Sequence, residues 1–198
     1  IILDQGEIRI FSNPSANSSS VYPPALKRIV DSSETPDIHD EIRRWPDYDE
    51  TPLHCLAGIA TELNVSKIWY KDESTRFGLK SFKALGGAYA VAKQIRKIIV
   101  DASVDEPVDE RWDEPSLSDL LDHRYRNLIS KLVMTCATDG NHGRSVAWGC
   151  SLFGCASVIY IHREVSAGRA HAMEALGATI VRVDGNYDDS VRQAAFDA

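Results

Sequence analysis

The chain has few cysteines, and they are not arranged as a metal site or a disulfide framework. Four cysteines occur among 198 residues, and none forms a CxxC pair. Zinc sites usually bring cysteines in closely spaced pairs, and small secreted domains carry many more of them. The six histidines also lack HExxH or another ligand spacing. We therefore expect no catalytic metal, and a reducing, cytoplasmic environment.

Long apolar runs and net positive charge are absent as well. No stretch approaches the ~20 apolar residues that cross a bilayer, and the first residues lack the basic segment and apolar core of a signal peptide. The 22 Lys and Arg residues against 29 Asp and Glu give a formal net charge of -7. No broad basic surface is expected, so neither nucleic acid nor a membrane is the predicted partner. A small anionic ligand remains compatible with local donors.

Strands and helices alternate in the second half of the sequence. Strand-like runs occur at 131–137, 156–162 and 179–183, and helical patterns occur at 144–153, 167–176 and 187–198. Strands separated by helices form a parallel sheet with right-handed crossovers. The pattern predicts an α/β protein with an open, twisted, mostly parallel sheet and flanking helices.

The first half has fewer regular patterns. Thr51-Pro52 offers an N-cap followed by proline, and the apolar spacing that follows predicts a helix from Thr51 to Leu63 packed on a core. A strand at 66–70 and a long helix from 81 to about 100 come next. The stretch 101–115 is acidic and contains two prolines, which favours an exposed excursion before a helix at 117–129.

A lysine stands at the start of the long predicted helix, in the sequence Arg-Phe-Gly-Leu-Lys-Ser-Phe-Lys that ends at Lys83. An amine that attacks a carbonyl must be neutral, and both the positive end of a helix dipole and an adjacent ring disfavour the ammonium form. Lys83 meets both conditions if Phe82 covers the site. On spacing alone a solvated surface lysine is the more frequent outcome, and Lys80 is expected to be an exposed charge or a local support.

A second motif, Ala-Thr-Asp-Gly-Asn-His-Gly at 137–143, lies between a predicted strand and a predicted helix. Its two glycines permit a tight turn, and free N–H groups at the helix start would bind a carboxylate such as that of an amino acid. The carboxyl ends of parallel strands are where such sheets bind ligands. The alternative is a simple turn in which Asp139 or Asn141 only caps the helix.

Together the two motifs resemble those of the fold-type-II pyridoxal-phosphate (PLP) enzymes, which include threonine and serine dehydratases, serine racemase and threonine synthase. The implied fold is tryptophan-synthase-β-like. Asp139, where dehydratases commonly have serine, and the segment Asn186-Tyr187-Asp188-Asp189 make the chain similar to the diaminopropionate ammonia-lyase family in particular. The resemblance extends from about Thr51 to Ala195.

The resemblance implies a set of site residues. Lys83 would hold PLP as a Schiff base, Phe82 would pack near the cofactor, and Asn141 would donate a hydrogen bond to the 3-oxygen of the ring. Asp139 would be the base at the α-carbon of the D-substrate, and the freed Lys83 amine would serve the L-substrate. The substrate carboxylate would lie on backbone N–H groups of Asp139, Gly140, Asn141 and His142. Asp188 and Asp189 are expected only to cap the last helix.

The implied activity is that of a PLP-dependent carbon–nitrogen lyase. It would convert 2,3-diaminopropionate to pyruvate and ammonia by abstraction of the α-proton and elimination of the β-amine. Two alternatives remain open: a serine or threonine dehydratase of the same fold, against which Asp139 argues, and a truncated fragment that is catalytically inactive.

Family members are about twice as long, which predicts that the chain is an N-terminal fragment of a homodimeric enzyme with a small amino acid substrate. Residues 1–100 would be the N-terminal part of the large PLP domain, and 101–116 an acidic insertion. Residues 117–198 would form a small α/β domain that carries the Asp-Gly-Asn-His-Gly loop and whose completeness stays open. The remainder of the large domain, with the glycine-rich phosphate loop, would be absent.

Overall fold

The computed structural model describes residues 2–4, 7–9, 13–15, 22–27, 33, 35–104 and 113–198. The chain divides into two compact units, Ile1–His39 and Asp40–Ala198. In the first unit, the elements are an antiparallel pair of strands and a short 3-10 helix, namely β1 (Ile2–Asp4), β2 (Glu7–Arg9) and η1 (Pro24–Leu26). Helix α1 (Thr35–Ile42) spans the division in sequence. Of the predicted acidic insertion 101–116, residues 105–112 lie outside the described residues.

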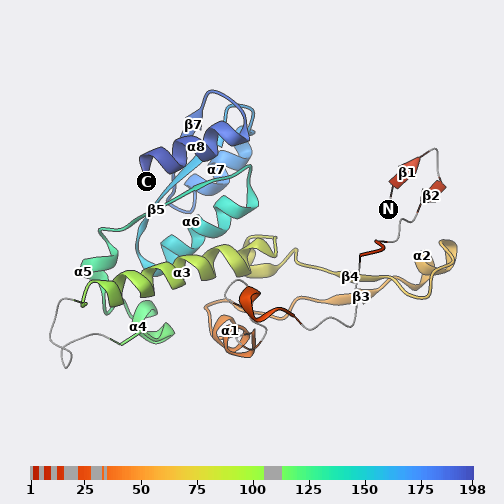
Figure 1. Cartoon of the computed structure of the whole chain (residues 1–198), viewed down its shortest axis with the longest axis horizontal. Coiled ribbons are helices and arrows are strands. Elements are labelled where there is room, and N and C mark those ends of the chain that lie inside the picture. The colour runs from red at the N-terminus through yellow and green to blue at the C-terminus, as the bar shows by residue number, and fades with distance from the viewer. Residues whose placement is uncertain are drawn as a thin grey trace. The chain divides into compact units, whose positions relative to one another are not determined.

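A parallel sheet with flanking helices occupies the C-terminal half of the second unit (Figure 1). Its strands run in the order β5 (Val133–Ala137), β6 (Ala156–His162) and β7 (Thr179–Val183). The intervening and following helices are α6 (Asn141–Phe153), α7 (Ala167–Glu174) and α8 (Tyr187–Asp197). The register pairs Ala137 with Tyr160 and His162 with Val183, so β6 continues two residues past the end of β5. The predicted α/β fold class is confirmed.

Helix α3 (Lys83–Asp101) packs along α6 through small residues (Figure 1). A Cβ atom on Gly87 would lie 2.7 Å from the Cβ of Ser145, and one on Gly149 would lie 2.8 Å from the Cα of Ala88 and 3.4 Å from the Cβ of Val91. A contact nearer the start of α3 thus meets a residue nearer the start of α6, and a later contact on α3 meets a later residue on α6. The two helices therefore run in the same general direction and begin at the same end of their contact.

The segment after Thr51 differs from the prediction. Strand β3 (Leu53–Cys55) pairs antiparallel with β4 (Trp69–Lys71), and only the short helix α2 (Ala57–Glu62) lies between them. Pairing with β4 keeps the chain extended where the apolar spacing predicted helix. The predicted helix from Thr51 to Leu63 is therefore wrong in its first part. Leu53 and Leu63 are 58% and 63% exposed, so this segment is not packed on a core here.

The predicted helix at 117–129 is divided into α4 (Leu117–Leu121) and α5 (Arg126–Ile129). A capping box between Ser116 and Asp119 starts α4, and His123 interrupts the helix with a φ of 55°. The predicted boundary between 1–100 and 117–198 stays a prediction, although α3 and α6 from its two sides pack together. No helix in the described ranges is long and apolar enough to span a membrane.

Candidate active site

Lys83 is the first residue of α3, as predicted. Its backbone N–H donates to the Ser81 hydroxyl at 3.2 Å, and its side chain is exposed. The Nζ atom lies 5.1 Å from the centroid of the Phe82 ring, which is itself 60% exposed. The amine is thus accessible to a carbonyl compound and lies beside an aromatic ring at the positive end of a helix. The predicted place of Phe82 against the cofactor stays a prediction.

The turn before Lys83 is fixed by a buried arginine. Arg76, in the short helix η3 (Arg76–Gly78), donates from Nε to the Glu73 carboxylate at 2.8 Å, from Nη1 to the Asp49 carbonyl at 2.8 Å and from Nη2 to the Thr51 hydroxyl at 2.9 Å. The hydrogen bond from Arg76 holds the pKa of Glu73 below its ordinary value. Every side of the guanidinium therefore has an acceptor, which makes its burial tolerable.

An aromatic contact ties the same turn to α6. Phe77 adopts a positive φ of 47°, which is uncommon outside glycine, and its ring lies 4.7 Å from that of Trp148 on α6. Arg144, also on α6, donates to the Leu79 carbonyl at 3.0 Å. The chain that leads to Lys83 is therefore attached to the helix that follows the Asp-Gly-Asn-His-Gly loop.

Thr138 organises that loop. Its hydroxyl accepts hydrogen bonds from the backbone N–H groups of Gly140 at 3.0 Å and Gly143 at 3.2 Å. Gly143 has no room for a side chain, because a Cβ there would lie 2.7 Å from the Sδ of Met173. The Gly140 amide, predicted to bind the substrate carboxylate, is engaged by Thr138 in this structure.

The N–H groups of Asn141 and His142 begin α6 and have no acceptor within the described part of the chain. Because α3 and α6 start at the same end of their contact, these amides and Lys83 share one region. Burial, and after it the positive charge of Lys83, hold the pKa of His142 below its ordinary value. This influence of the Lys83 charge is consistent with the arrangement of the two helix starts.

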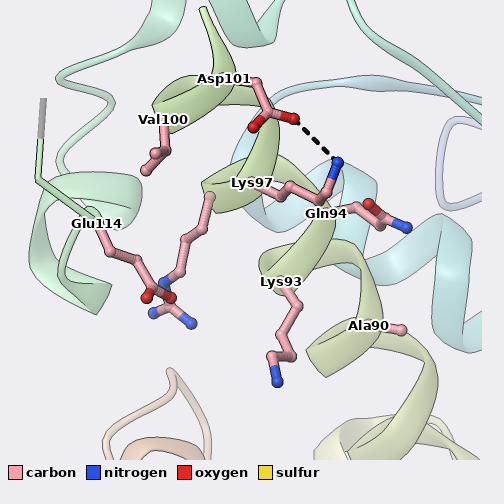
Figure 2. Close-up of a pocket in the computed structure, with 8 residues that line it drawn as sticks. Ala90, Lys93, Gln94, Lys97, Val100, Asp101 and Glu114 are labelled. Carbon is pink, nitrogen blue, oxygen red and sulfur yellow. Dashed lines mark hydrogen bonds and ion pairs between the residues drawn. The ribbon is translucent and has the colours of Figure 1, made fainter. Parts of the chain in front are cut away.

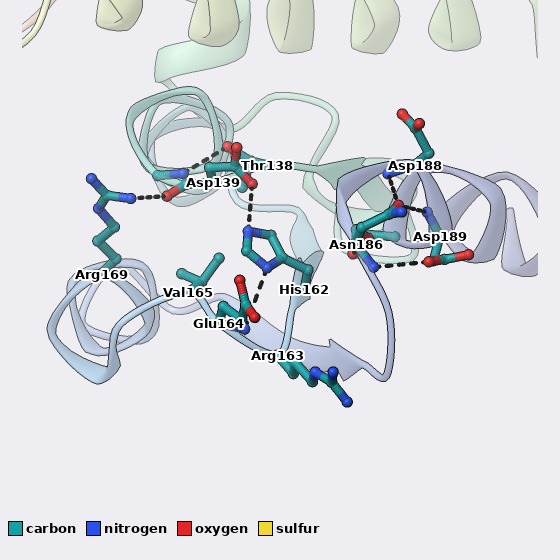
Figure 3. Close-up of polar contacts among 12 residues, drawn as sticks. Thr138, Asp139, His162, Arg163, Glu164, Val165, Arg169, Asn186, Asp188 and Asp189 are labelled. Carbon is teal, nitrogen blue, oxygen red and sulfur yellow. Dashed lines mark hydrogen bonds and ion pairs between the residues drawn. The ribbon is translucent and has the colours of Figure 1, made fainter.

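Asp139 follows β5, and its carboxylate points toward β6 (Figure 3). Its Oδ1 lies 3.2 Å from Nε2 of His162, and its backbone carbonyl accepts a hydrogen bond from Arg169 on α7 at 3.2 Å. No local sequence pattern indicates a role for His162. The rule that ligands bind at the carboxyl ends of parallel strands is a signal that would have singled it out, since it is the last residue of β6.

Two other features lie apart from these residues. Asn186 and Asp189 form a capping box at the start of α8, which confirms the capping expected of Asp189, whereas Asp188 only adds negative charge to the first turn (Figure 3). A hollow of about 540 Å³ follows the outer face of α3 (Figure 2). Its lining includes Lys93, Lys97 and Glu114 but none of the predicted site residues.

The fold and the site define the class of protein. Residues 45–197 match the family described as pyridoxal-phosphate dependent enzyme, and the chain belongs to this family. The family's cofactor is PLP. The residues present here fit it, because an accessible lysine at a helix start lies near unpaired amide N–H groups that suit a bound anion.

Within that class, the chain is most informatively compared with diaminopropionate ammonia-lyases. It is 39% identical to the enzyme of Salmonella typhimurium over 153 residues, which are 77% of this chain and 35% of that protein. It is 39% identical to the Escherichia coli enzyme over 73% of this chain and 33% of that protein. The chain therefore spans about a third of the length of these curated relatives.

Solved structures give the same relationship. The apo form of the Escherichia coli diaminopropionate ammonia-lyase superimposes with a TM-score of 0.71 and 36% identity, covering 84% of this chain and 42% of that one. The same enzyme in complex with an aminoacrylate-PLP azomethine reaction intermediate gives a TM-score of 0.69 and 34% identity, covering 84% and 38%.

Proposed function

We propose that this chain supplies the cofactor-holding lysine and the carboxylate-binding loop of a PLP-dependent ammonia-lyase. The enzyme would convert 2,3-diaminopropionate to pyruvate and ammonia. The observation that carries the proposal is the parallel packing of α3 on α6, which brings Lys83 and the unpaired amides of Asn141 and His142 to one end. The cytoplasmic location and the homodimer predicted for the full protein are part of the same proposal.

Binding would use the start of each helix. Lys83 would attach the cofactor, and its neighbour Phe82 would shield the attachment from water. The side chain of Asn141 would donate to the 3-oxygen of the cofactor ring. The backbone N–H groups of Asn141 and His142 would receive the substrate carboxylate, since two adjacent donors at a helix start match its charge and shape.

Proton transfer would use Asp139 and Lys83. When bound, PLP supplies a conjugated ring that accepts the electron pair left on the α-carbon. Asp139 would remove the α-proton of the D-isomer and the Lys83 amine that of the L-isomer. With the D-isomer, Asp139 would then give the proton that it has removed to the departing β-amino group, because an amide anion is a very poor leaving group. Positioned acid–base groups of this kind contribute about 10²–10⁴ in rate.

The first test labels the lysine. Purified protein would be mixed with PLP, reduced with borohydride and mapped by peptide mass spectrometry, for the unmodified chain, Lys83→Ala and Lys80→Ala. Lys80 is a matched control, because it is also exposed and only three positions away. We expect label on Lys83, retained in Lys80→Ala and lost in Lys83→Ala. Label on another lysine in the unmodified protein would contradict the assignment.

The second test separates the ammonia-lyase from a serine or threonine dehydratase of the same fold. Asp139→Ser in the full chain encoded by the gene should lower turnover of D-2,3-diaminopropionate and raise the relative activity on serine. Labelled Lys83 without turnover of either substrate would instead favour the catalytically inactive alternative.

A further inference from the structure

We propose that His162 is a positioning residue that holds the Asp139 carboxylate in one orientation. In its working geometry the Nε2–H group would donate to Oδ1, which would leave Oδ2 to exchange protons with the substrate. This rests on the role proposed above for Asp139. His162 touches neither the cofactor nor the substrate in this proposal and acts only through Asp139.

The sheet register places the two side chains together. Strands β5 and β6 are parallel, and the Thr138 N–H donates to the Tyr160 carbonyl at 3.0 Å, one residue beyond the last pair of the ladder. His162 lies two residues further along β6, beside the first residues of the loop. Its Nε2 is 3.2 Å from Asp139 Oδ1. The backbone pairing of the sheet therefore brings the two residues side by side, and the rotamer of Asp139 sets the distance between their side-chain atoms.

Burial differs between the two partners. The His162 side chain is 19% exposed, whereas that of Asp139 is 55% exposed. A shielded ring on a strand has little freedom, and an exposed aspartate on a loop has several rotamers open to it. The contact between them therefore constrains Asp139 much more than it constrains His162.

The hydrogen bonds of the ring also select its tautomer. The Glu164 N–H donates to His162 Nδ1 at 3.3 Å, so Nδ1 acts as an acceptor (Figure 3). A neutral imidazole carries one N–H group, which must then be on Nε2, the nitrogen that faces Asp139. The N–H group of the neutral ring is thus on the nitrogen that lies 3.2 Å from the Asp139 carboxylate.

Among the described residues, the nearby arginine side chains bind other groups and not the Asp139 carboxylate. Arg169 on α7 binds the backbone carbonyl of Asp139, and Arg182 on β7 binds the carbonyls of Arg163 and Val165. Arg163 pairs with Asp184 after β7 at 2.8 Å. Within the described ranges, His162 is the one side chain that pairs with the Asp139 carboxylate.

The kinetic test uses the full chain encoded by the gene, loaded with PLP. His162→Phe keeps a ring but removes the donor, His162→Gln keeps an N–H donor, and His171→Phe on α7 is the matched control. We expect His162→Phe to lower kcat for the D-isomer about 10- to 100-fold, with little change in KM, because misplacing a catalytic group by about 1 Å has an effect of this size. Activity on the L-isomer should change much less, and His162→Gln should recover most of the loss.

Two further measurements make the result decisive. Nitrogen-15 NMR of the imidazole groups in the cofactor-free full chain should show His162 protonated on Nε2 and not on Nδ1. Borohydride labelling of Lys83 should persist in His162→Phe, which would show that the site is assembled.

Three results would overturn the proposal. They are a proton on Nδ1 of His162, equal losses of activity on both isomers, and full activity of His162→Phe on the D-isomer when Asp139→Asn has none. If His162→Phe fails to take label, the ratio of kcat on the D-isomer to kcat on the L-isomer is measured in His162→Gln. A ratio close to that of the unmodified enzyme supports the proposal, and an equal loss on both isomers overturns it. Absence of label in the unmodified protein would instead be a failure of the proposed function.

Discussion

At the scale of single residues, the buried pair of Arg76 and Glu73 links stability to pH. A carboxyl whose pKa is lower in the folded than in the unfolded state stabilises the fold at pH above its unfolded value. That stabilisation disappears as the pH falls through the lower, folded value. The ordinary pKa of Glu73 is 4.5, and the hydrogen bond from Arg76 lowers it in the fold. Acid should therefore weaken the turn that precedes Lys83.

We predict that Glu73→Gln lowers the free energy of unfolding by about 3 kcal/mol at pH 7, because it leaves a buried charge without its counter-ion. Its unfolding free energy should also depend less on pH below 4.5 than that of the unmodified chain. Urea unfolding at several pH values measures both effects. Asp101→Asn, which breaks an exposed pair with Lys97, is the control and should cost less than about 0.5 kcal/mol. Equal effects of the two substitutions would contradict the prediction.

Sequence patterns pointed to some of these residues and not to others. The position of Lys83 at a helix start follows from the local sequence and is confirmed. The contacts of Arg76 with Asp49 and Thr51 join segments more than twenty residues apart in sequence, so no local pattern reveals them. The same holds for His162, which meets Asp139 only because two strands are neighbours in the sheet.

At the scale of elements, the adjacent glycines of α3 have opposite environments. A Cβ on Gly86 would meet nothing within 4 Å, whereas one on Gly87 would press on Ser145 of α6. We predict that Gly86→Ala stabilises the chain by about 1 kcal/mol, since alanine is the better helix former. Gly87→Ala should destabilise it by roughly 1–3 kcal/mol through overpacking.

Thermal or urea unfolding of the two variants tests this difference. The double variant Gly87→Ala with Ser145→Gly provides space for the added methyl group, although it also removes the hydroxyl that accepts a hydrogen bond from the Ala88 N–H at 3.0 Å. Partial recovery is therefore expected. If Gly87→Ala were as stable as Gly86→Ala, the helices would not be packed as described.

The elements that could be predicted are those with a strong local period. Strands β6 and β7 have the predicted bounds, because their apolar runs are ended by polar or turn residues. The helix expected from Thr51 fails because its apolar spacing suits either structure, and pairing with β4 decides in favour of a strand. That pairing partner is more than ten residues away, so the local sequence does not contain the deciding information.

At the scale of the whole molecule, the β3–β4 hairpin exposes large apolar side chains. Leu53, Trp69 and Tyr70 are 58%, 55% and 51% exposed. Apolar groups gathered on one exposed element favour association. We predict that the 198-residue chain binds a hydrophobic dye and self-associates, and that the double variant Leu53→Gln and Trp69→Gln reduces both. Dye fluorescence and sedimentation velocity measure these effects. Unchanged association of that variant would show that another surface is responsible.

The family of the molecule could be predicted from two short motifs, whereas its division into domains stays a prediction. The lysine and loop motifs are specific because each residue type has a chemical task in the site. Domain boundaries depend instead on which surfaces pack, and here α3 and α6 pack across the predicted boundary. The matched relatives are about three times longer than the aligned part, so the phosphate-binding residues stay a prediction.

The close approach of α3 and α6 also restricts how the site moves. At the crossing, Gly87 and Gly149 let the helices touch through backbone and small side chains, and such a contact leaves no layer of long side chains along which one helix could slide. We therefore expect Lys83 and the loop at 138–143 to move together. Opening of the site to admit a cofactor or substrate would then come from side-chain rotation, or from other parts of the protein moving away from this helix pair.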